Sequence, residues 1–114
     1  MIEKIVLDYL GAALSVPVRM ETPEDPPREY VLIDKTGSSV TNHIDRATLA
    51  IQSVSSVSLY RAAQINEEVK VAMEDILALP QIFRAKRNTD YNFTNPQTKQ
   101  YRYQAVYDMT YKEV

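Results

Sequence analysis

The last third of the chain contains an uninterrupted two-residue alternation that runs from residue 101 to residue 111. One parity carries tyrosine at four of its six positions and the other is mostly polar, which is the period of a β-strand whose two faces meet different surroundings. An eleven-residue strand spans roughly 36 Å, whereas a domain of this size is roughly 30 to 35 Å across. We therefore expect this strand to reach or pass the edge of its own domain, leaving edges that a neighbouring subunit covers.

The tyrosine face has two interpretations. Aromatic residues favour strands whatever they contact, so the face can pack on the chain's own helices. Tyrosine is also enriched at protein interfaces, because its ring is apolar while its hydroxyl can stay wet. The sequence leaves both open, and the inner half of the strand can pack the core while its ends meet a neighbour.

The first half of the chain predicts one amphipathic helix followed by a hairpin. Apolar residues recur at helical spacing over residues 2–14, and Pro17 ends that helix because it lacks an N–H group. Residues 16–20 read as a short extended segment, and the proline-rich, acidic segment 21–29 as a solvated loop. Residues 30–35 and 44–54 are strand candidates, joined by a turn or flexible tip over 36–43.

The second half predicts a longer helix and two more strands. Ser58 is a plausible N-cap for a helix whose apolar spacing continues up to Pro80. Segments 82–87 and 101–111 then read as strands around a polar loop, 88–99. The sequence therefore predicts a single α+β domain, residues 1–114, with two helices packed on one face of a mostly antiparallel sheet of four to five strands.

Composition excludes several function classes. The net charge of -2 gives no electrostatic basis for gripping nucleic acid. The chain has no cysteine, so it can form neither a disulfide nor a thiolate metal site. No apolar run approaches the roughly 18 residues that a membrane span needs, and charged residues interrupt the N-terminal apolar pattern where a signal peptide would have none. The expected compartment is the cytoplasm, with no membrane contact.

No constellation of residues predicts catalysis, a metal or a cofactor. His43 is the single histidine, and Asp45 lies two residues away with Ser38 and Ser39 in the preceding segment. A nucleophilic serine normally stands on a strained turn beside glycines, and that pattern is missing here. The two glycines are too few for a phosphate-binding loop. We expect no enzyme, although a small hydrolase that uses His43 remains an alternative.

A basic cluster precedes an aromatic pair near the end of the chain. Arg84, Lys86 and Arg87 are followed by Tyr91 and Phe93, a combination that can stack on single-stranded nucleic acid. The acidic balance of the chain favours instead an outward-facing strand parity for Arg84 and Lys86. From alternation and charge, the predicted partner or oligomer interface consists of Tyr101, Tyr103, Tyr107, Tyr111, Arg84, Arg87, Tyr91 and Phe93.

Three stretches carry a family resemblance: HIDRATLAIQS (43–53), SLYRAAQINEEVKVAM (58–73) and RNTDYNFTNPQTKQYRYQAVYDMTY (87–111). They resemble the small neck and tail-completion proteins of long-tailed, siphovirus-type phages and prophages of Gram-positive bacteria, which are often labelled minor capsid or tail proteins. The resemblance covers residues 1–111 and is strongest in YRYQAVYD (101–108). Within that group the chain is assigned to the tail terminators, a family of similar size with an α/β or α+β fold, assembled as a ring that is commonly a hexamer.

The resemblance implies structural work in the virion, at the junction of tail and head, after assembly in the host cytoplasm. Its expected partners are further copies of the chain, the tail tube protein and the head-completion protein of the neck. DNA is expected only to pass through the channel, without specific binding. The alternatives are a head-tail stopper or adaptor, the hydrolase mentioned above, and a small dimeric regulator that binds a protein partner.

Overall fold

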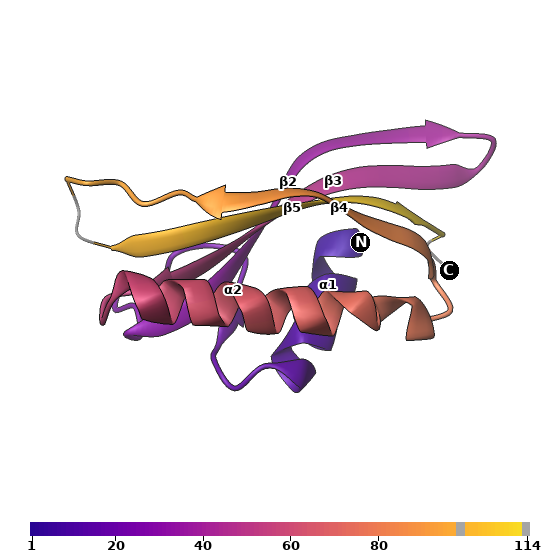
Figure 1. Ribbon diagram of the computed structural model, residues 1–114. Helices are drawn as coiled ribbons and strands as arrows, with labels where there is room; N and C mark the ends of the chain where they lie inside the picture. The colour runs from indigo at the N-terminus through magenta and orange to yellow at the C-terminus, as the bar shows by residue number, and fades with distance from the viewer. Residues whose placement is uncertain (98–99, 113–114) are drawn as a thin grey trace.

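The computed structural model describes residues 1–97 and 100–112. Its elements in chain order are α1 (Ile2–Ala13), β1 (Val18–Arg19), β2 (Glu29–Thr41), β3 (Ile44–Ser55), α2 (Leu59–Glu74), a 3-10 turn (Ile76–Ala78), β4 (Ile82–Asn92) and β5 (Tyr101–Tyr111). The strands form one sheet in the order β1-β2-β3-β5-β4, antiparallel except for the parallel β1–β2 pair. Both helices lie on the same side of this sheet (Figure 1). The α+β prediction, with two helices on one face of a mostly antiparallel sheet, is confirmed.

The first helix forms where the apolar spacing places it, whereas the second ends at Glu74, short of the predicted limit at Pro80, and a 3-10 turn follows at Ile76–Ala78. In α1, Ile2, Val6 and Leu10 are buried, and the helix ends at Ala13, ahead of Pro17. In α2, the Ser58 hydroxyl accepts a hydrogen bond from the Arg61 amide at 3.1 Å, which satisfies one of the free N–H groups of the first turn.

β5 is an interior strand of the sheet, between β3 and β4. It pairs with β3 on one side and β4 on the other along its length. The predicted alternation is confirmed, since Ala105, Tyr107 and Met109 are buried against the helices while Asp108 is exposed on the outer face. Because neighbours cover both of its edges, the expectation that this strand leaves edges for a neighbouring subunit to cover is wrong.

The element that overreaches is the β2–β3 hairpin. Segment 36–43, expected to be a turn or flexible tip, is mostly strand, and the turn itself consists of Asn42 and His43. Their φ angles of 53° and 64° are both positive, which is the backbone of a type I′ hairpin turn. Gly37 lies instead at a register shift within β2. Residues 34–44 are all exposed, and Figure 1 shows the hairpin projecting from the body. We call residues 35–46 the arm.

The arm makes the molecule elongated, with extents of 44 × 25 × 25 Å, so the expected diameter of roughly 30 to 35 Å is wrong for its long axis. The fourth strand is also longer than predicted. β4 continues to Asn92, which places Tyr91 within the sheet. Part of the predicted 88–99 loop is therefore strand, and residues 98 and 99 lie outside the described residues.

We expect Leu49→Ala to lower the free energy of unfolding by about 2 to 5 kcal/mol, because the side chain is fully buried between the sheet and the helices and its removal leaves a cavity. Urea unfolding followed by circular dichroism measures this change. Val71→Ala is the control, since Val71 is 61% exposed on α2, and it should stay within about 0.5 kcal/mol of the wild type. A Leu49→Ala loss below about 1 kcal/mol would contradict the assigned core.

Candidate assembly surfaces

The four tyrosines of β5 divide between core and rim. Tyr107 and Tyr111 are buried, at 3% and 5% exposure, so in this structure their rings have no surface to offer a partner. Burial raises the pKa of the Tyr107 phenol, while the nearby Arg87 guanidinium acts in the opposite direction. Tyr101 and Tyr103 are half-buried at the other end of the strand. Of the tyrosine face, only this end stays available for contact.

Tyr91 and Phe93 stand together at the end of β4. Their ring centroids are 5.9 Å apart in an edge-on arrangement, and the two side chains are 40% and 46% exposed. The Gln104 amide donates to the Tyr91 hydroxyl at 2.5 Å. Gln52 donates in turn to Gln104 at 2.9 Å. The pair is thus held by a polar network on the outer face, and its rings remain accessible.

Arg84 and Arg87 face opposite sides of the sheet. Arg84 lies beside Thr110 on the outer face, as the outward parity predicted. A second register shift, between Arg87 and Thr89, changes the parity of β4. Arg87 lies opposite the inward-facing Tyr107, and its Nε is 3.6 Å from Asp90. Asp90 also pairs with Lys70 of α2 at 3.2 Å, so Arg87 belongs to a charge cluster that joins β4 to α2.

The outer face contains a hollow of about 470 Å³ at the root of the arm. Its cations are Arg46, Arg84 and Lys86, and among the described residues that line it Asp108 is the one acid. That carboxylate accepts hydrogen bonds from Thr48 at 3.0 Å and from Asn88 at 3.1 Å. We call this surface the basic hollow. It is polar, open to solvent and bounded on one side by the arm residues 37–39.

The opposite side of the molecule is acidic. Glu67, Val71 and Glu74 follow at helical spacing on the side of α2 turned away from the sheet, because Ile65 and Val69 face inward. With their exposed neighbours they form a surface that we call the acidic helix face, which consists of Tyr60, Glu67, Glu68, Val71, Glu74 and Asp75. Tyr60 and Val71 are its apolar members, at 71% and 61% exposure.

A groove continues this face toward α1. It has a volume of about 600 Å³ and lies between the end of α1 and the middle of α2. The Tyr9 hydroxyl donates to the Ala72 carbonyl at 2.6 Å across it, which ties the two helices together. Burial, followed by the negative charge of Asp75, raises the pKa of Tyr9. The helix layer therefore presents one continuous surface.

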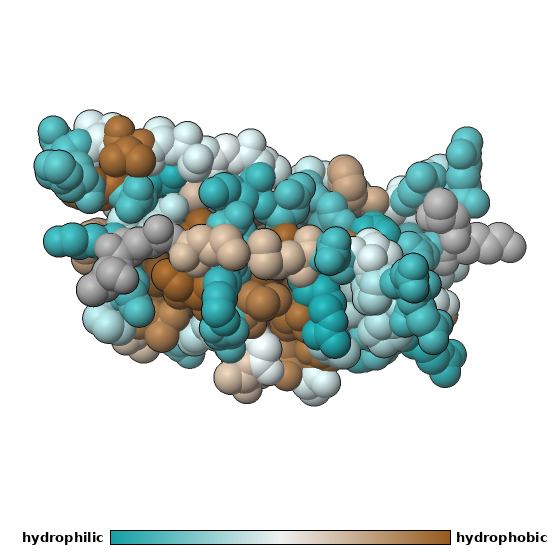
Figure 2. Space-filling view, turned by 180° about the vertical axis from the view of Figure 1, so that it is seen from behind, coloured by the Kyte–Doolittle hydropathy of each residue, from teal (hydrophilic) through white to brown (hydrophobic). Residues whose placement is uncertain are grey.

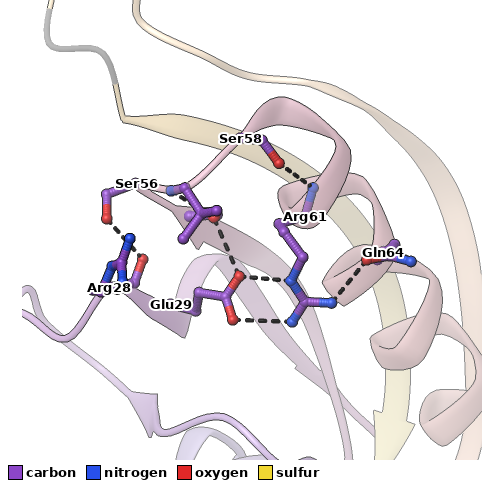
Figure 3. A network of polar contacts seen from close by, with 8 residues as sticks. Arg28, Glu29, Ser56, Ser58, Arg61 and Gln64 are labelled. Atoms are coloured by element: carbon purple, nitrogen blue, oxygen red, sulfur yellow. Dashed lines mark hydrogen bonds and ion pairs between the residues drawn. The ribbon is translucent and has the colours of Figure 1, made fainter.

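An ion pair fixes the start of α2 against the sheet (Figure 3). The Arg61 guanidinium donates to both oxygens of Glu29, at 2.7 and 2.9 Å, and to Gln64 at 2.8 Å. The Arg61 hydrogen bond lowers the pKa of Glu29, against the effect of burial, and raises that of Arg61. This two-point contact orients the helix that carries the acidic face.

Figure 2 shows the back of the molecule, where apolar side chains gather in the middle and lower part while the ends are mostly polar. On the arm, Val40 and Ile44 are exposed apolar residues, at 68% and 36%. Sequence reasoning missed the arm, the basic hollow and the acidic helix face. The acidic residues within 67–75 are evident in the sequence. They do not indicate that a basic surface lies on the other side of the sheet.

The hydrolase alternative finds no support at His43. This residue is exposed at the tip of the arm, in the turn. Ser38 and Ser39 lie back along β2, opposite Ala47 and Arg46. Such a tip has no walls to exclude water from a reaction. In the described part of the chain, no group of three or more histidine, cysteine, aspartate or glutamate side chains could hold a metal ion.

A search of the described residues found no helix of sufficient length and apolarity to cross a bilayer. No family model matches the chain, and no curated protein matches it. Among solved structures, it is similar to a chain of the virion of a native gene transfer agent particle, with 12% identity, 95% of this chain and 84% of that chain covered, and a TM-score of 0.47. A likeness at this level supports no conclusion about function.

We expect the stability of the protein to fall with pH partly through Glu29. Its folded-state pKa is lower than the ordinary value of 4.5, so its contribution is present above that value and is lost as pH falls through the folded-state pKa. In urea unfolding, Glu29→Gln should be less stable than the wild type at neutral pH, and the difference should shrink between about pH 5 and about pH 3. Glu21→Gln, an exposed control, should follow the wild type. A Glu29→Gln difference that is independent of pH would contradict this assignment.

We expect His43→Gly to stabilise the arm by up to about 1 kcal/mol, because glycine adopts a positive φ without a Cβ clash. His43→Val should weaken the same turn, since a β-branched side chain tolerates this backbone poorly. Amide hydrogen exchange of residues 38–47 measures both effects. Faster exchange in His43→Gly than in the wild type would contradict the turn assignment.

Proposed function

We propose that this chain is a structural protein of a long-tailed phage-type particle, and that its place is the tail terminator ring at the tail–head junction. One support is the resemblance carried by residues 43–53, 58–73 and 87–111. The proposal assigns the chain no catalytic role and no cofactor. Its partners are further copies of itself, the tail tube protein and the head-completion protein.

The observation that carries the proposal is the arm. Residues 34–44 are exposed on both faces of the hairpin, so this segment gains little from the core of its own subunit. The outer edge of β2 beyond Leu32 has no partner strand among the described residues. A long uncovered edge is a liability in a lone monomer and an asset in a subunit whose neighbours cover it. The arm therefore favours an assembled protein.

A terminator needs two unlike sides, because one must match the last ring of the tube while the other must not repeat that surface. The helix layer and the outer sheet face meet this requirement, since the first carries Glu67 and Glu74 and the second carries Arg46 and Arg84. Head-to-tail contacts of one chain close into a ring when the rotation between subunits closes. The small net charge of -2 suits a channel through which DNA slides without being held.

Six of the eight predicted interface residues remain candidates for contact. Tyr91, Phe93 and Arg84 lie on accessible surface, and Tyr101 and Tyr103 lie half-buried at the rim. Arg87 is partly engaged with Asp90 but stays 42% exposed. Tyr107 and Tyr111 support β5 from within, and we propose no partner contact for them.

We expect the purified chain to form a ring of about six subunits at high concentration or with the tube protein present, as measured by light scattering on a sizing column. A strict monomer under both conditions would contradict the proposal. Particles that lack the protein should have tails of abnormal length that fail to join heads. Tails of normal length without heads would move the assignment to a head-tail stopper. His43→Ala particles should stay infectious, and a loss of infectivity would favour the hydrolase alternative.

A further inference from the structure

We infer that the basic hollow receives the acidic helix face of a second copy of this chain, so that subunits join helix layer to outer sheet face. This inference rests on the proposed function, because the contact repeats around an axis only if the chain forms the proposed ring. The opposite charges of the two surfaces select this contact. Both surfaces expose charged side chains to solvent in the single subunit.

The basic hollow carries more positive than negative charge. Arg46 on β3 and Arg84 on β4 flank Thr110 of β5 from either side, which places their backbones about 10 Å apart. Lys86 lies opposite Asp108 on the same face. That carboxylate is already hydrogen-bonded to Thr48 and Asn88. The three cations therefore exceed the local negative charge and point to an anionic partner.

The acidic helix face offers the complementary charge. Its four carboxylates occupy residues 67–75, and the cation of that segment, Lys70, is only 14% exposed and already pairs with Glu67 and Asp90. The helix is sixteen residues long, or roughly 24 Å. Its ridge is a convex rod, whereas the hollow is a concavity with the arm as one wall. Shape and charge both fit.

Charge alone gives an exposed contact little strength, so an interface also needs apolar anchors. The acidic helix face supplies Tyr60 and Val71, both largely exposed. On the receiving side, Phe83 precedes Arg84 on β4 and is 52% exposed. Aromatic side chains of this kind carry much of the binding energy in protein interfaces. The charges then fix the orientation and exclude a contact between like faces.

The two surfaces lie on opposite sides of the sheet, because the helices cover one face and the hollow opens on the other. A contact between them joins unlike patches, and it leaves each new copy with one free patch of each kind. Such a contact propagates until the ring closes. It also neutralises Arg46 and Arg84 within the protein wall, which keeps these cations from the phosphates of passing DNA.

Charge reversal tests the contact in the purified chain. The hollow variant carries Arg46→Glu and Arg84→Glu, and the helix variant carries Glu68→Lys and Glu74→Lys. Each should weaken self-association at least about 100-fold in sedimentation equilibrium, because like charges then meet. Lys4→Glu with Lys112→Glu is the matched control for the hollow variant: it makes the same change in net charge as that variant, on residues outside both surfaces, and should associate as the wild type does. Circular dichroism checks that each variant is folded.

Recombination of the variants gives the sharper result. A mixture of hollow and helix variants should assemble again, because every contact then joins opposite charges. A variant with all four substitutions should also assemble alone. A ring that neither reversal weakens would overturn this contact and leave the proposed function standing. A wild-type chain that stays monomeric at all concentrations, with and without the tube protein, would overturn both the contact and the proposed ring, whereas normal tails and heads in particles that lack the protein would overturn the proposed function alone.

Discussion

The four long strands of this sheet, β2 to β5, extend further than the helices that cover them. β2 has thirteen residues, which reach roughly 40 Å, while α1 and α2 have twelve and sixteen, or roughly 18 and 24 Å. Two helices of this length cover the middle of one face and nothing else. The excess strand becomes the arm, and the second face of the sheet stays open to solvent. The arm and the basic hollow both follow from this mismatch.

Within the covered part, the pairing of β5 with both neighbours sorts side chains by parity. Tyr107 and Met109 go to the core, while Asp108 and Thr110 go to the outer face beside Arg46 and Arg84. The same parity rule that builds the core therefore also gathers the cations of the basic hollow. On the other side of the sheet, the Glu29–Arg61 pair fixes the start of α2. This contact sets the orientation of both the buried side of the helix and the acidic helix face.

The two helices, strand β5 and the layer arrangement could be predicted. They depend on apolar periodicity and on local signals such as the N-cap Ser58 and the helix-ending Pro17. The arm could not, since Asn42 and His43 form its turn with positive φ and without glycine, while Gly37 drew attention to the wrong position. The register shift after Arg87 moves Tyr91 to the outer face beside Gln104, which alternation from Arg84 does not indicate.

The interface candidates were predicted with mixed success for a related reason. Alternation identified Tyr101, Tyr103, Tyr107 and Tyr111 as one face, but it could not tell which part of that face the helices reach. Burial now divides them, with Tyr107 and Tyr111 inside and the other pair at the rim. The complementary charge of the two sides could not be predicted from sequence, because only the pairing of β3 and β4 with β5 brings residues 46, 84 and 86 together.

The most direct measurement of the head-to-tail account is cross-linking, which the absence of cysteine makes clean. A Val71→Cys, Thr110→Cys double variant puts one thiol on the acidic helix face and one in the basic hollow. A short bismaleimide should then give a ladder of cross-linked species that ends at the size of the ring, while each single variant should give little product. Efficient cross-linking of either single variant to itself, or no ladder from the double variant, would contradict the account.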